Sequence, residues 1–191
     1  MMGLTPYSWV KERARIPLLI TLITATIALS LVLSSIGQSL KNQTAPQGII
    51  SFELAGTESR AEQIVSSWSQ PARYDAFLSI GIDYLFLCVY PLAISLACVV
   101  ASARLTRYRA LAKTGAALGW LVLGAGLLDA VENFAMIRML KSIEGDAWPM
   151  LAKWCAIPKF GLVALGILYV LLAVLLLVSR RFLRKPKSKA A

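Results

Sequence analysis

Four long apolar stretches dominate the pattern of hydrophobic and polar positions along the chain. They cover approximately residues 16–37, 76–103, 113–140 and 154–178. A helix needs about 20 residues to cross the hydrocarbon core of a bilayer, and each stretch is long enough. A core helix of a soluble protein shows a polar stripe along its whole length, whereas these stretches collect their polar residues at one end. The pattern therefore predicts an all-α, four-helix transmembrane bundle that forms a single membrane domain over residues 1–191.

The connection over residues 38–75 shows a different pattern. Apolar residues recur there with the spacing of one helical face, at Ala61, Ile64, Val65 and Trp68. Ser59 and Glu62 have the spacing of a capping box, and Pro71 marks an end. These features predict a short amphipathic helix in the first outer loop.

An apolar run with Glu53 embedded in it precedes this helix, and Gly56 follows the run. Two interpretations of the whole loop remain open. It lies on the bilayer surface with Trp68 at headgroup depth, as interfacial tryptophans often do, or it covers the outer mouth of the bundle as a lid.

The composition agrees with a membrane protein. Hydrophobic residues make up 58% of the chain and charged residues 16%, against roughly 45–50% and 25% in soluble domains. The mean hydropathy is +0.67. These values exclude a disordered chain, a coiled coil and an ordinary soluble enzyme. The net charge of +10 does not indicate a nucleic-acid partner, because 13 of the 20 Lys and Arg residues flank the apolar stretches.

The basic residues instead predict the orientation. They gather in residues 11–15, 104–113 and 180–189, which all fall on one side of a four-span chain. Positively charged connections stay in the cytoplasm, so both termini are expected there. The tail over residues 179–191 is expected to fix topology and to attract anionic lipids. An alternative is that the first stretch is a cleaved signal peptide, but it is longer than an ordinary signal-peptide core.

Charged and polar residues inside the predicted spans are the main candidates for function. Helix geometry places them in one band, about 8–17 Å below the outer helix ends. The members of this band are Asp83, Asp129, Glu132, Asn133 and Lys159. Charges at this depth are costly and usually face protein or water. We therefore expect them to meet inside the bundle.

Helical phase supports an interior position for this band. On the third stretch Asp129 and Asn133 share a line with three glycines, which mark close helix packing: Gly115, Gly119 and Gly126. On the second stretch Asp83 and Tyr90 share a face, and Pro91 is expected to kink this helix near Tyr90.

Several chemistries fit this band. In one interpretation Lys159 neutralises Asp83, Asp129 or Glu132 in a structural network, with Glu132 as the preferred partner. In another, Lys159 snorkels to the lipid headgroups. Glu132 or Asp129, with Tyr90, are the candidates for catalytic acid–base chemistry on a lipid, or for a proton relay. We expect no metal site, because Lys159 lies among the carboxylates, and no cofactor; the chain has no His to serve as a ligand.

Four segments together suggest a relationship. They are residues 52–57 followed by Trp68, residues 83–86 with Tyr90, residues 129–133, and Lys159 and Phe160 with Tyr169. In this order they resemble a group of small, uncharacterised bacterial four-span membrane proteins, over residues 49–169. The resemblance implies a four-helix architecture and the bacterial inner membrane. It implies no reaction, substrate or cofactor.

The sequence thus favours an integral membrane protein that binds a lipid or a lipophilic small molecule in a polar pocket of the outer leaflet. A subunit role beside another membrane protein is equally compatible. The expected ligand-binding residues are Asp83, Tyr90, Asp129, Glu132, Asn133, Lys159, Glu53 and Trp68. Membrane-embedded enzyme chemistry and proton-coupled transport remain the alternatives; the sequence leans against an enzyme.

Overall fold

The computed structural model describes residues 5–141 and 144–183. Its elements are α1 (Glu12–Ile36), η1 (Gly37–Leu40), α2 (Ile49–Glu53), α3 (Glu58–Ser67), α4 (Gln70–Phe86), α5 (Tyr90–Arg104), α6 (Arg109–Lys141) and α7 (Ala147–Leu183). Four helical stretches are long and apolar enough to span a membrane: Glu12–Leu40, Gln70–Arg104, Arg109–Lys141 and Ala147–Arg180. The predicted all-α, four-span bundle with a short amphipathic helix in its first loop is confirmed.

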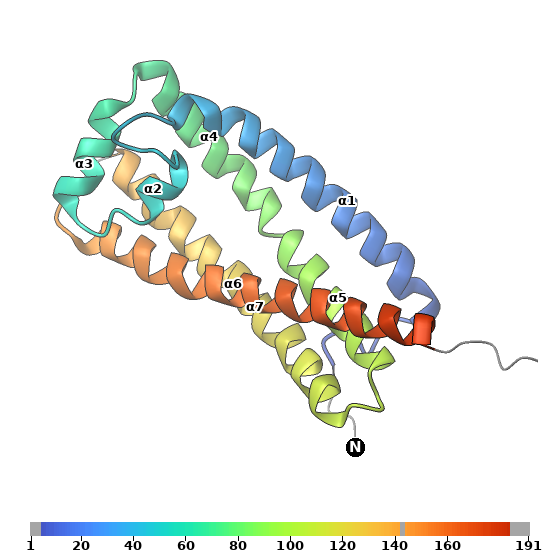
Figure 1. The fold of residues 1–191 in the computed structure, drawn as a ribbon. Helices are drawn as coiled ribbons and strands as arrows, with labels where there is room; N and C mark the ends of the chain where they lie inside the picture. Colours follow the sequence, from blue (N-terminus) through green and yellow to red (C-terminus); the bar gives the residue numbers. More distant parts are fainter. Residues whose placement is uncertain (1–4, 142–143, 184–191) are drawn as a thin grey trace, which may run out of the picture.

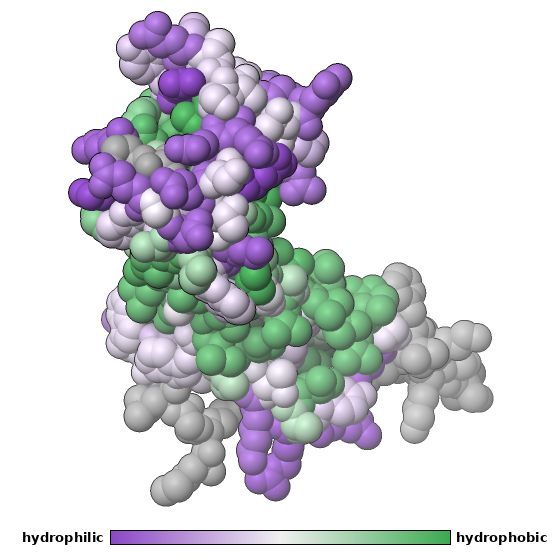
Figure 2. Space-filling view, turned by 90° about the vertical axis from the view of Figure 1, so that its left-hand side faces the viewer, coloured by the Kyte–Doolittle hydropathy of each residue, from purple (hydrophilic) through white to green (hydrophobic). Residues whose placement is uncertain are grey.

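The spanning helices pack unequally (Figure 1). α6 packs against α7, and α5 packs against both, whereas α1 packs against α4 and α5. No side chain of α1 is buried by the other helices. α1 carries exposed apolar residues, such as Ile20 and Leu31. Figure 2 shows a broad hydrophobic belt between two hydrophilic ends of the molecule. Such a large exposed apolar surface is expected where lipid is the solvent.

The second span is interrupted at residues 87–89, which separate α4 from α5. Pro91 lies in the first turn of α5 and has no backbone N–H to donate to the preceding turn. The backbone tightens into turns there, with Cys88 N donating to Leu85 O at 3.2 Å and Val89 N donating to Phe86 O at 2.9 Å. The kink expected at Pro91 is therefore a complete break between two helices.

The loop after α1 folds over one end of the bundle, and we call residues 41–69 the roof (Figure 1). Trp68 is only 3% exposed. Its indole N–H donates to Leu40 O at 2.9 Å, and its ring meets Phe52 edge-on at 5.4 Å. The interpretation of Trp68 as a headgroup anchor is therefore wrong, because the residue lies in the core that the roof shares with the spans. Met136 of α6 and Ala152 of α7 belong to that core.

The ends of the amphipathic helix differ from the sequence prediction. Gly56 has φ +74° and ends the preceding turn, so Thr57 is extended and caps α3. The Thr57 hydroxyl accepts from Arg60 N at 3.3 Å, and the predicted cap at Ser59 is wrong. Pro71 does not end this helix either. It lies in the first turn of α4, where proline is well tolerated.

Three glycines of α6 lie at close helix contacts, as their shared face predicted. Gly115, Gly119 and Gly126 are all buried. A Cβ on Gly119 would lie 2.9 Å from the Val99 Cγ2 atom of α5. α6 and α5 therefore approach more closely at this level than larger residues allow.

The basic tail predicted over residues 179–191 lies largely outside the described residues. Within them, the Arg180 guanidinium lies over the Tyr108 ring at 4.1 Å, between the end of α7 and the α5–α6 connection. Near the C-terminal end of α6, the Arg138 guanidinium lies over the Trp148 ring, 5.3 Å from the ring centroid.

Candidate functional site: a buried charge cluster

Five polar side chains from four elements meet inside the bundle, and we call them the charge cluster. They are Glu53 of α2, Tyr90 of α5, Asp129 and Glu132 of α6, and Lys159 of α7. All five are buried, with Glu132 fully inaccessible and Lys159 only 6% exposed. α6 presents two of the acids together because residues three apart lie on one helical face.

Lys159 is the centre of this cluster. Its ammonium donates to Asp129 Oδ1 at 2.9 Å and to Glu132 Oε1 at 2.8 Å. Its Nζ also lies 2.8 Å from Glu132 Oε2 and 3.9 Å from Glu53 Oε2. The Tyr90 hydroxyl donates to the second oxygen of Asp129 at 2.8 Å. Lys159 therefore does not snorkel to the surface; it holds acids from two elements around one positive charge.

Asp83 and Asn133 form a separate pair beside the charge cluster. The Asn133 amide donates to Asp83 Oδ2 at 2.7 Å, and Asp83 itself is half-buried on α4. Lys159 forms its ion pairs with Asp129, Glu132 and Glu53. Glu53 of the roof therefore takes the position beside Lys159 that the sequence allowed for Asp83. Of the eight expected ligand-binding residues, Trp68 alone lies away from both groups, in the core of the roof.

The charge cluster has more acceptors than donors. Glu53 Oε2 is buried without a hydrogen-bond partner, and so is Asn133 Oδ1 in the neighbouring pair. Glu132 Oε2 also forms no hydrogen bond and has only its ion-pair contact with Lys159 Nζ, at 2.8 Å. A buried polar atom without a partner typically costs about 1–3 kcal/mol. The site is therefore suited to take up a proton or a group that donates hydrogen bonds.

Glu53 lies in the roof, outside the membrane spans, and its environment is unusual for a carboxyl. Burial raises the pKa of Glu53 above its ordinary value, and the positive charge of Lys159 offsets this only in part. A raised pKa means that the folded protein binds the proton of Glu53 more tightly than the unfolded chain does.

This effect predicts a pH dependence of stability. The contribution of Glu53 is fully present below the ordinary glutamate pKa of about 4.3 and is lost as the pH rises through the folded value. Glu53→Gln, which stays neutral, should flatten the fall in melting temperature between about pH 5 and pH 8. Thermal unfolding in one detergent measures it. Glu62→Gln, on the exposed face of α3, should keep the parental slope; identical slopes for all three proteins would contradict the prediction.

An apolar groove with a volume of about 190 Å³ lies between α1, α5 and α7. It is lined by Ile23, Thr26 and Ile27 of α1, Ala93, Ile94 and Ala97 of α5, and Ile167, Val170 and Leu171 of α7. Tyr90 lies one turn before Ile94 on α5, and Lys159 lies two turns before Ile167 on α7. Along the helices, the end of the groove nearest the roof therefore lies about one turn from Tyr90 and about two turns from Lys159. Sequence reasoning missed the groove, although Ala93 and Ala97 repeat at helical spacing on one face.

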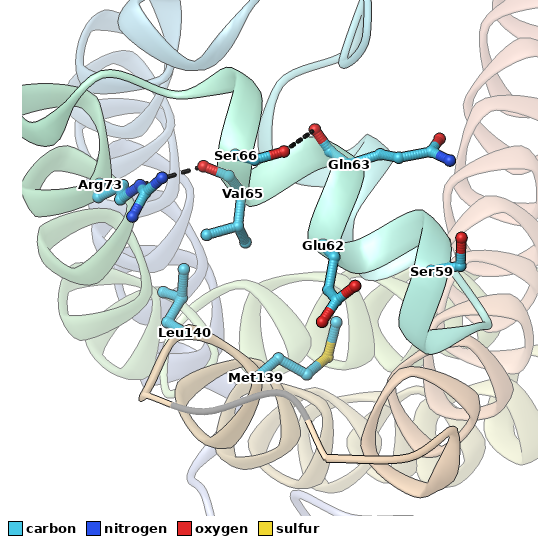
Figure 3. Close-up of a pocket in the computed structure, with 8 residues that line it drawn as sticks. All are labelled: Ser59, Glu62, Gln63, Val65, Ser66, Arg73, Met139 and Leu140. Carbon is cyan, nitrogen blue, oxygen red and sulfur yellow. Dashed lines mark hydrogen bonds between the residues drawn. The ribbon is translucent and has the colours of Figure 1, made fainter.

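A second hollow, of about 570 Å³, opens between α3, the start of α4 and the end of α6 (Figure 3). Arg73 donates to Val65 O at 3.0 Å, and the Ser66 hydroxyl donates to Gln63 O at 3.1 Å. Glu62 extends toward Met139 at its floor (Figure 3). Arg73 and Ser66, two polar lining residues, thus bond to backbone carbonyls of the roof. None of the lining residues belongs to the charge cluster.

No protein-family model matches the chain, and no curated protein and no solved structure matches it. The relationship to small bacterial four-span proteins stays a prediction from the sequence.

Proposed function

We propose that this membrane protein binds a lipid or a lipophilic small molecule, with the apolar part in the groove between α1, α5 and α7. The polar head of the ligand would point toward the charge cluster. The observation that carries this proposal is the position of the groove, whose outer end lies one turn from Tyr90. An amphipathic ligand needs an apolar channel that ends at fixed polar groups. A small number of polar groups is enough to fix the orientation of the ligand.

The polar head is expected to donate hydrogen bonds. Asp83 is half-buried, and one of its oxygens already accepts from Asn133. A half-buried carboxyl at membrane depth is costly unless a donor or a cation satisfies it. A hydroxyl or amine on the ligand would do so, which favours a head group of this kind over a purely anionic one.

We do not propose catalysis for Tyr90, Asp129 or Glu132. Their side chains bond to one another and to Lys159 in a buried site beneath the roof. A subunit role with another membrane protein has no specific contact in its favour.

For the location, we propose the inner membrane of a bacterium with both termini in the cytoplasm. The basic segments support this orientation, because the start of α1, the α5–α6 connection and the end of α7 lie at the end of the bundle opposite the roof (Figure 1). Positive charge on one side is the usual determinant of topology.

Native mass spectrometry of the purified protein tests the binding function. The parent should carry a bound lipid or lipophilic molecule at fixed stoichiometry. Ala97→Phe should lose it, because the ring fills the groove. Ala164→Phe is the matched control, since Ala164 is exposed on α7 and does not line the groove. A parent without bound ligand, or equal ligand on both variants, would overturn the proposal.

A further inference from the structure

The charge cluster contains an imbalance that ligand binding in the groove does not explain. Glu53, Asp129 and Glu132 surround the single ammonium of Lys159. The other titratable neighbours are Tyr90 on α5, Asp83 on α4 beyond Asn133, and Cys155 on α7, where Glu132 and Lys159 both act on the thiol. All of these except Lys159 are acids, so with every carboxyl ionised the cluster holds several uncompensated negative charges.

The hydrogen bonds show where the imbalance lies. Asp129 is satisfied at both oxygens, by Lys159 and by Tyr90. The unpartnered carboxyl oxygens belong to Glu53 and Glu132, which are 8% and 0% exposed. Both oxygens face the same ammonium, at 3.9 Å and 2.8 Å. Two carboxylates in this arrangement repel each other and are also shielded from water.

A metal ion does not resolve this arrangement. Hard cations need about six or more oxygen ligands, and the Lys159 ammonium already occupies the space between the carboxyls. A proton does resolve it, because a protonated carboxyl is a hydrogen-bond donor and carries no charge. We propose that Glu53 and Glu132 hold one proton between them, and that this pair with Lys159 is a proton-binding site that exchanges with the water above the roof.

Glu53 gives the site its route to water. It is the one member of the charge cluster that lies in the roof rather than in a spanning helix. Its helix, α2, lies between Gly48 and Gly56, whose φ values are +60° and +74°. Lys153 of α7 packs against the roof at Gly56, since a Cβ on Gly56 would lie 2.7 Å from the Lys153 Cδ atom. A proton that leaves Glu132 therefore passes to Glu53 and from there to the solvent side of α2.

Infrared spectroscopy of the protein in lipid membranes tests the proposal. The parent at neutral pH should show the C=O stretching band of a protonated carboxylic acid, which shifts in D₂O and declines as the pH is raised. Glu53→Gln and Glu132→Gln should each reduce the band, because each removes one member of the pair. Glu62→Gln, on the exposed face of α3, should leave it unchanged.

Two results would overturn the proposal. The first is a parent protein without a protonated carboxyl band at neutral pH, which needs no variant to fold. The second is a band of parental intensity in both Glu53→Gln and Glu132→Gln, which would place the proton on another acid such as Asp83. Neither result depends on ligand binding in the groove, so the test is independent of the proposed function.

Discussion

Replacing Lys159 by methionine should destabilise the protein by about 3–5 kcal/mol, the usual cost of removing one partner from a buried ion pair. Methionine keeps the length and most of the apolar stem of lysine, so packing changes little. The loss comes from Asp129 and Glu132, which lie within 2.9 Å of the ammonium and are left without a counter-ion.

Thermal or denaturant unfolding in a fixed detergent measures this effect. Lys141→Met is the control, because Lys141 is exposed at the end of α6. Combining Lys159→Met with Glu132→Gln should restore part of the stability, whereas combining it with Asp83→Asn should restore none. A Lys159→Met protein as stable as the parent between about pH 5 and pH 8 would show that the charge cluster does not hold the helices together.

Gly166→Leu should cause the second large effect, because α7 passes close to both α5 and α6 there. A Cβ on Gly166 would lie 2.7 Å from Ile94 Cγ2 of α5 and 2.9 Å from Val122 Cγ2 of α6. Overpacking typically costs about 1–3 kcal/mol, and a whole leucine at a helix crossing should reach the upper part of that range. The melting temperature should fall, and α7 should separate more readily from α5 and α6.

Gly161→Leu provides the matched control for this substitution. Gly161 lies on the same helix, is exposed, and has no other atom within 4 Å of its Cβ position. Both variants gain similar helix propensity over glycine, so the difference between them reports the close approach alone. Equal melting temperatures for the two variants would mean that the three helices are free to move apart at this level.

The sequence was sufficient for the fold because length and hydropathy determine membrane spans. It failed where tertiary contacts set the ends of elements. α4 begins at Gln70 rather than near residue 76, because Ser69 caps it and Pro71 suits its first turn. The roof could not be placed from periodicity, because the indole of Trp68 is equally suited to a headgroup layer and to the core with Phe52 that it occupies.

The charge cluster was predicted only in part, for a related reason. Residue spacing gives the depth of Asp129, Glu132 and Lys159 along their helices. The hydrogen bonds of Lys159 with both acids confirm that the three residues lie at one level. Spacing does not give the rotation of one helix about another, so Asp83 was expected beside Lys159 but bonds to Asn133 instead. Glu53 comes from a separate short helix, and no periodic pattern places it among the spans.

The order of residues in the chain determines the order in which the members of the charge cluster are synthesised. Glu53, Asp129 and Glu132 all precede Lys159 in the sequence, so a ribosome delivers the acids before their counter-ion. Until the last span arrives, the charged side chains of Asp129 and Glu132 each bear an insertion cost of about 2.5–3.5 kcal/mol in the bilayer. Docking of α7 removes that cost. A nascent chain that stops short of α7 therefore keeps acids without their counter-ion in the membrane.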